Sequence, residues 1–144
     1  MPSVFHSLIK RLVGAALSCL IVISLILSPI ALSANAASSS MSGDYVNDTI
    51  SVAQSLQETI ALPKEAEERE EAEDQALKLI TNYISRYRNR SKVNKSQSFT
   101  TMQTALNSMA GHYKTFANRP LPEALKERLN KELSKAEKLV SKGS

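Results

Sequence analysis

The stretch Ser98-Phe-Thr-Thr-Met-Gln-Thr-Ala-Leu-Asn-Ser-Met-Ala-Gly-His-Tyr-Lys-Thr-Phe116 decides the fold of this chain. Its large apolar residues recur at steps of three and four: Phe99, Met102, Leu106, Met109, Tyr113 and Phe116. That spacing places all of them on one face of an α-helix. We therefore predict an amphipathic helix here, with Ser98 or Thr100 as its N-cap.

The same periodicity appears on both sides of this stretch. A helix is predicted from Asp44 to Pro63, with Tyr45, Val52, Ala53, Leu56 and Ile60 on its apolar face. Another is predicted with Pro122 as its first residue, which needs no N–H donor there, and with Gly143 at its end. Its apolar face comprises Leu125, Leu129, Leu133, Ala136 and Val140.

A fourth helix is predicted between these two, starting near Glu65 and ending at Arg86 to Arg90. Its start is acidic and its end basic, an order that favours both ends of the helix dipole. Its apolar positions are Ala72, Ala76, Leu79, Ile80, Tyr83, Ile84 and Tyr87. No segment alternates with period two as a strand would. Four such helices with short connections predict an all-α fold, an up-down-up-down four-helix bundle over residues 44–144.

The first 36 residues have the layout of an export signal. They lack acidic residues and place Lys10 and Arg11 before an apolar run from Leu12 to Leu32. Small residues at Ala34 and Ala36 predict cleavage after Ala36. Because about 20 apolar residues suffice to cross a bilayer, an uncleaved anchor is the alternative. Residues 37–43 are small and polar and predict a flexible lead-in to the bundle.

Composition argues against several classes of function. The whole chain has 18 Lys and Arg against 14 Asp and Glu, too weak a positive charge for a typical nucleic-acid binder. Its one cysteine, Cys19, lies within the signal, and His112 has Met109 rather than Glu three residues before it. The thiol, di-iron and hydrolase motifs are therefore missing. We expect no catalytic, cofactor or metal residues, and hence no enzyme.

Two polar segments are candidates for binding a partner. Arg86, Arg88 and Arg90, continued by Lys92 and Lys95, would suit an acidic protein surface or anionic lipid, or be a solvated helix end. The corner Asn118-Arg-Pro-Leu-Pro122 is stiffened by two prolines and can present Arg119 in a fixed direction, unless Arg119 only caps a helix. His112 beside Tyr113 is either an interface contact or a histidine at the core boundary.

The stretches Ser98 to Tyr113 and Asn118 to Pro122, with Asp44 to Ile50 and Ile84 to Arg88, resemble the lumenal photosystem II assembly and repair factor family Psb twenty-seven. The resemblance implies a monomeric four-helix bundle without catalytic activity. It also implies transient binding in the thylakoid lumen to immature photosystem II, at the large lumenal loop of the smaller inner-antenna chlorophyll protein. Binding would precede the manganese cluster and the extrinsic subunits. From charge and this resemblance together, we expect the partner-binding residues to be Arg86, Arg88, Arg90, His112, Tyr113, Asn118 and Arg119.

The N-terminus departs from the family pattern. Cyanobacterial members are typically lipoproteins with a cysteine directly after the apolar segment, and Ala16-Leu17-Ser18-Cys19 fits that pattern only loosely. Cleavage after Ala36, lipidation at Cys19 and an uncleaved anchor therefore remain alternatives. The rival function is a peripheral helical protein that binds the anionic thylakoid membrane surface through Arg86 to Lys95.

Overall fold

The computed structural model describes residues 41–117 and 119–143. The predicted export signal, Cys19 and Asn118 lie outside these residues. The described chain forms four helices and contains no strand: α2 (Tyr45–Ala61), α3 (Arg69–Tyr87), α4 (Gln97–Thr115) and α5 (Glu123–Ser141). The predicted all-α class is confirmed.

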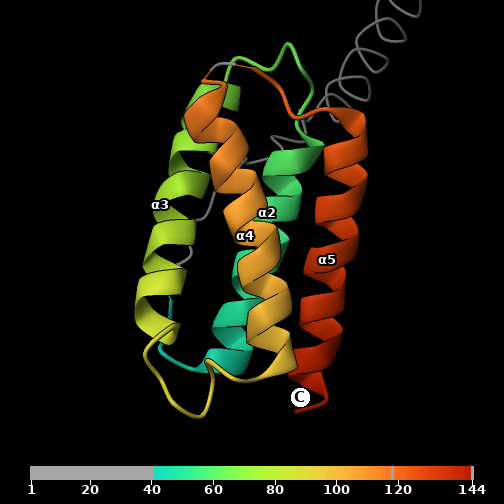
Figure 1. Ribbon diagram of the computed structural model, residues 1–144. Helices are drawn as coiled ribbons and strands as arrows, with labels where there is room; N and C mark the ends of the chain where they lie inside the picture. Colours follow the sequence, from blue (N-terminus) through green and yellow to red (C-terminus); the bar gives the residue numbers. More distant parts are fainter. Residues whose placement is uncertain (1–40, 118, 144) are drawn as a thin grey trace, which may run out of the picture. The chain divides into compact units, whose positions relative to one another are not determined.

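The four helices run alternately up and down and pack in a closed cycle (Figure 1). Each helix packs against the next along the chain, and α5 returns to pack against α2. The loop between α3 and α4 lies at one end of the bundle, together with the start of α2 and the end of α5. The other two connections, residues 62–68 and the described residues 116–117 and 119–122, lie at the opposite end. The predicted up-down-up-down bundle is confirmed.

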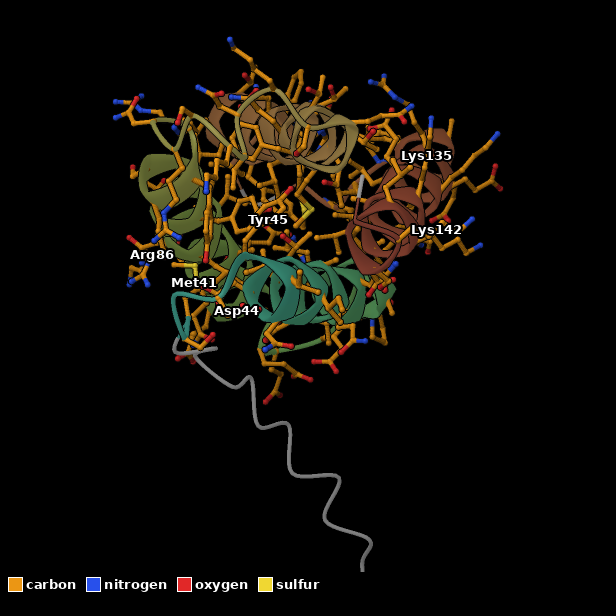
Figure 2. The ribbon with its side chains drawn as sticks, turned by 90° about the horizontal axis from the view of Figure 1, so that it is seen from below. Met41, Asp44, Tyr45, Arg86, Lys135 and Lys142 are labelled. Atoms are coloured by element: carbon orange, nitrogen blue, oxygen red, sulfur yellow. The ribbon has the colours of Figure 1, made fainter. Side chains whose placement is uncertain are left out.

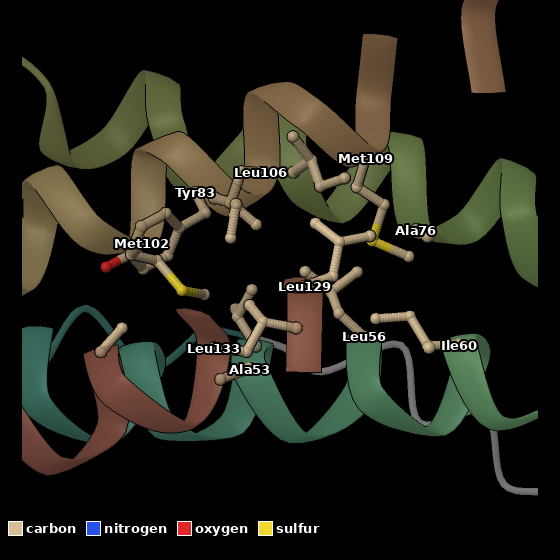
Figure 3. Close-up of a cluster of buried hydrophobic side chains, with 14 of the residues drawn as sticks. Ala53, Leu56, Ile60, Ala76, Tyr83, Met102, Leu106, Met109, Leu129 and Leu133 are labelled. Carbon is tan, nitrogen blue, oxygen red and sulfur yellow. The ribbon is translucent and has the colours of Figure 1, made fainter. Parts of the chain in front are cut away.

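The predicted apolar faces meet in one continuous core (Figure 3). At its centre, Leu56, Leu106 and Leu133 are each 0% exposed. Burying such a side chain stabilises the fold by about 1.5–3 kcal/mol. The four amphipathic faces thus cover one another in one shared core.

Two predicted helix starts were wrong, those of α3 and α5. Helix α3 begins at Arg69 rather than near Glu65, because residues 63–69 form two successive turns, closed by Ala66 N–H to Pro63 O and by Arg69 N–H to Ala66 O. Pro122 is the N-cap of α5, one residue before the first helical position.

The predicted caps of α4, Ser98 and Thr100, were also wrong. Ser96 is the N-cap, and its hydroxyl accepts the N–H of Phe99 at 3.2 Å. Ser98 is buried inside the first turn, where its hydroxyl lies 2.9 Å from the hydroxyl of Tyr45. At the other end, Phe116 was predicted on the apolar face but is 44% exposed, because it follows the last helical residue.

Candidate functional site

The structure divides the predicted partner-binding residues between the two ends of the bundle. Arg86, Arg88 and Arg90 lie where α3 ends, whereas His112 and Arg119 lie at the opposite end. Tyr113 is only 5% exposed, so it packs in the core and cannot be a surface contact as predicted. Asn118 lies outside the described residues. The candidate site is therefore two separate surfaces.

The first surface, which we call the basic end, consists of residues 41–44 and 86–97. The segment 86–97 carries five cations and no acidic residue. All five side chains are exposed: Arg86, Arg88, Arg90, Lys92 and Lys95. None of them forms an ion pair within the described part of the chain. Their charge is therefore available to an external partner.

A buried carboxylate that the sequence analysis missed organises this end. Asp48 is 2% exposed and accepts four hydrogen bonds. The backbone N–H groups of Ser42 and Gly43 donate at 2.6 and 3.0 Å, the Ser42 hydroxyl at 2.8 Å and the Tyr87 hydroxyl at 2.6 Å. Burial acts to raise the pKa of Asp48, but the bonds from Tyr87, Ser42 and Gly43 outweigh it and leave the pKa below 3.8. Asp48 therefore remains a carboxylate at neutral pH.

These bonds tie the chain before α2 onto the basic end. Arg90 Nη1 donates to the carbonyl oxygen of Gly43 at 3.2 Å, and its guanidinium lies 4.6 Å from the centre of the Tyr87 ring. Gly43 has a φ of 93°, which a residue with a side chain rarely adopts. Ser42 and Gly43, the last residues before Asp44 in the predicted lead-in, are held by these hydrogen bonds. Figure 2 shows Met41, Asp44 and Arg86 together at this end.

A second polar layer lies beside Asp48. The Thr49 hydroxyl donates to the carbonyl of Tyr45 at 2.6 Å and lies 2.7 Å from the Tyr83 hydroxyl. Tyr83 is 0% exposed, and burial raises its pKa far above the usual value. Because the Thr49 hydroxyl gives its only hydrogen to the Tyr45 carbonyl, the Tyr83 hydroxyl donates to Thr49. The end of the bundle nearest the basic segment is therefore held by specific polar pairs as well as by apolar packing.

The second surface, the Phe116 corner, consists of His112, Phe116 and Arg119. The His112 ring N–H donates to the carbonyl of Arg119 at 3.2 Å, and the His112 ring centre lies 5.2 Å from that of Phe116. The Arg119 guanidinium lies 5.9 Å from the Phe116 ring centre. Leu121, which is 4% exposed, anchors the connection to α5 in the core. The corner thus presents an exposed aromatic ring beside a cation, and a hydrogen bond holds the Arg119 carbonyl to His112.

Neither surface combines the groups that a metal site needs. Within residues 41–117 and 119–143, no three His, Cys, Asp or Glu side chains gather in a way that could hold a metal ion. In the same residues no helix is long and apolar enough to span a membrane. The chemistry available at the two surfaces is positive charge, hydrogen-bond donation and, at the corner, an apolar ring, all of which serve binding.

Comparison with known proteins gives consistent matches over nearly the whole chain. A family model described as Photosystem II Pbs27 matches residues 10–140. The photosystem II lipoprotein Psb27 of Synechocystis sp. is 43% identical over 137 residues, which cover 95% of this chain and 98% of the relative. The photosystem II assembly factor lipoprotein Psb27 of Thermosynechococcus vestitus is 42% identical over 97 residues, covering 67% of this chain and 72% of that protein.

Solved structures share the same fold. The solution structure of Psb27 from cyanobacterial photosystem II matches with a TM-score of 0.69 and 46% identity, covering 72% of this chain and 90% of that one. The crystal structure of PSB27 from Arabidopsis thaliana matches with a TM-score of 0.67 and 27% identity, covering 69% of this chain and 98% of that one.

Proposed function

The chain belongs to the photosystem II Pbs27 family, and on that premise we propose that it is a non-catalytic assembly and repair factor of photosystem II. It binds the lumenal side of immature complexes transiently, before the manganese cluster and the extrinsic subunits are in place. The names of its relatives support both halves of this role. One is called an assembly factor lipoprotein and another, from Arabidopsis thaliana, a repair protein.

The observation that supports this proposal most strongly is the exposed ring at the Phe116 corner. Among the described residues only two large apolar side chains are substantially exposed, Val46 at 39% and Phe116 at 44%. Aromatic residues such as Phe and the cation Arg are both enriched at protein interfaces, and Arg is among the residues that most often dominate their binding energy. The corner combines both residue types, because Arg119 lies over the Phe116 ring. Val46 has no aromatic or cationic contact of this kind.

We propose that this corner docks on the large lumenal loop of the smaller inner-antenna chlorophyll protein. His112 and Arg119 contact the loop together with Phe116, and Asn118 belongs to the same contact by its place in the chain. Tyr113 supports the corner from the core without touching the partner. The hydrogen bond from His112 to the Arg119 carbonyl pre-orders the corner, so less conformational entropy is lost on binding.

The mechanism that follows is temporary occupation of a surface. A compact bundle on the loop holds it in one conformation and excludes late-binding extrinsic subunits by overlap. No step requires chemistry on the bundle itself. Residues 1–36 direct the chain to the thylakoid lumen, and cleavage after Ala36, lipidation at Cys19 and retention as an anchor predict different N-terminal peptides.

The test is affinity purification of the C-terminally tagged full-length protein from a cyanobacterial host, with mass spectrometry of its N-terminal peptide and its co-purifying subunits. The wild type should recover photosystem II subunits without the extrinsic set. The double variant F116A/R119E should recover at least about tenfold less, since one hot-spot residue contributes about 2 kcal/mol or more.

The matched control is V46A/R88E, which makes the same kinds of change at the other end of the bundle. It should recover photosystem II subunits at the wild-type level from detergent extracts. Equal loss with both double variants, or no loss with F116A/R119E, would contradict docking through the corner. Recovery of no photosystem II subunit by the wild type would contradict the function itself.

A further inference from the structure

Charge is strongly polarised along the bundle. At the start of α3 and just before it, seven of the ten residues 65–74 are acidic, whereas residues 86–97 at its other end carry five cations and no acid. Helix α3 has 19 residues, so about 28 Å separates the two ends. Such a separation gives the bundle a preferred orientation beside any extended charged surface.

The chain that precedes the bundle is fixed to the basic end. Asp48 accepts the N–H groups of Ser42 and Gly43, and Arg90 donates to the Gly43 carbonyl. The apolar run Leu12 to Leu32 therefore connects to this end through the short stretch 33–40, which spans at most about 28 Å when fully extended. Any attachment of the N-terminal segment to a membrane keeps the five cations near that membrane.

We propose that the basic end binds anionic lipid headgroups of the bilayer, so that the bundle stands with the Phe116 corner pointing away from the membrane. The proposal goes beyond photosystem II binding and does not depend on it. It assigns one surface to the membrane and leaves the opposite one for the partner protein. The full-length chain thereby reaches its partner already oriented.

The chemistry of the basic end fits headgroups in particular. Its cations sit on a turn-rich loop and a helix end, and all five side chains are exposed. None has an ion-pair partner among the described residues, although Arg90 also donates to the Gly43 carbonyl. A cluster of four to eight Lys and Arg next to a membrane-attached segment is the pattern that anionic lipids attract, and each cation contributes roughly a fivefold gain in affinity. The exposed Val46 in the first turn of α2 adds a small apolar contact at the same end.

The tether also makes weak contacts effective. Once the N-terminal segment holds the chain at a bilayer, headgroup binding becomes intramolecular, at an effective concentration in the millimolar range for a short linker. A loop that would bind free vesicles only weakly then stays occupied for much of the time. Because the contact is electrostatic, it depends on the salt concentration and on the charge of the lipid.

The experiment uses the full-length protein in lipid nanodiscs, made either of phosphatidylcholine alone or of phosphatidylcholine with 30% phosphatidylglycerol (roughly the charge density of anionic leaflets). Hydrogen–deuterium exchange is followed by mass spectrometry. On anionic discs the amides of residues 88–96 should exchange at least about fivefold more slowly than on neutral discs. Raising the salt to about 0.5 M should abolish the difference.

The variant R88E/K92E/K95E should lose this protection. It spares Arg86 and Arg90, which lie against Gly43. The matched control K64E/K78E/K114E changes the net charge equally with exposed lysines away from the basic end, and it should retain the protection. Slow exchange of the α2 amides in all three proteins would verify that the bundle is folded.

Equal exchange of residues 88–96 on neutral and anionic discs would overturn the proposal. So would protection of residues 62–68 or 116–122 in their place, or unchanged protection in R88E/K92E/K95E. The discs contain no photosystem II, so none of these results bears on the proposed function. Conversely, R88E/K92E/K95E should still recover photosystem II from detergent extracts, where no bilayer is present.

Discussion

Replacing Tyr87 with Phe removes one hydroxyl group from the polar network of the basic end and leaves the ring in place. The Tyr87 hydroxyl donates to Asp48 at 2.6 Å, and the two residues are 0% and 2% exposed. So short a distance is typical of a hydrogen bond to a charged acceptor. Such bonds contribute about 1.5–3 kcal/mol to stability, and Asp48 keeps its bonds from Ser42 and Gly43 in the variant. We expect Tyr87→Phe to lower the free energy of unfolding by about 2 kcal/mol at pH 7.

The assay is urea unfolding of a chain that begins at Ala37, followed by circular dichroism at 222 nm. With a slope of about 1–3 kcal/mol per molar urea, the transition midpoint should fall by about 1 M, while the slope itself stays unchanged. Tyr83→Phe is the matched control. Tyr83 lies one turn earlier in α3, is equally buried and donates to the neutral hydroxyl of Thr49. Its cost should be about 1 kcal/mol.

The two variants should also differ in their pH dependence. The folded-state pKa of Asp48 lies below its ordinary value of 3.8, so the folded protein binds fewer protons there than the unfolded chain. The stability that ionised Asp48 contributes is present above about pH 4 and is lost as the pH falls through the folded-state pKa. The deficit of Tyr87→Phe should therefore shrink below about pH 4, whereas that of Tyr83→Phe should stay constant. Equal deficits for the two variants at pH 7, or a deficit for Tyr87→Phe that persists in acid, would refute this account of Asp48.

Two further predictions concern the core and the start of α4. Leu133→Ala should lower the free energy of unfolding by about 2–5 kcal/mol, because Leu133 is 0% exposed. Urea unfolding measures this loss, and a loss below about 1 kcal/mol would contradict the place of Leu133 in the core. Ser96→Ala should lower it by about 1 kcal/mol, because its hydroxyl caps α4. Thr100→Ala should change the stability little, since Thr100 is exposed and its hydroxyl donates only to the Ser96 carbonyl. A larger loss for Thr100→Ala than for Ser96→Ala would indicate that Thr100 is the cap.

The sequence predicted the helices and most of the core because both follow from local periodicity. Met102, Leu106 and Met109 are buried as predicted, since residues three and four apart share a helix face whatever the rest of the chain does. Periodicity gives the direction of a side chain but not where the helix stops. Phe116 continues the pattern of α4, yet the helix ends at Thr115, and the ring therefore lies at the surface.

The polar features of the fold were harder to predict. Ser98 and Thr100 were the caps predicted from the sequence. Ser98 instead contacts Tyr45 in another helix, and Ser96, which was not considered, caps α4. Asp48 resembled an ordinary polar residue in the first turn of a helix. Its structural role comes from its hydrogen-bond partners. One of them, Tyr87, lies 39 positions away in the chain, so the local sequence does not reveal the contact.

The sequence by itself determined that this chain forms four amphipathic helices with one shared core, and its motifs identified the family. Tertiary structure decided which groups meet at the two ends of the bundle. The bond from Arg90 to Gly43 joins positions 47 apart, and that from Tyr87 to Asp48 joins α3 to α2. Such contacts depend on which helices become antiparallel neighbours, and the periodicity within one helix does not predict that. The fixed chain at the basic end and the exposed ring at the Phe116 corner both follow from that choice.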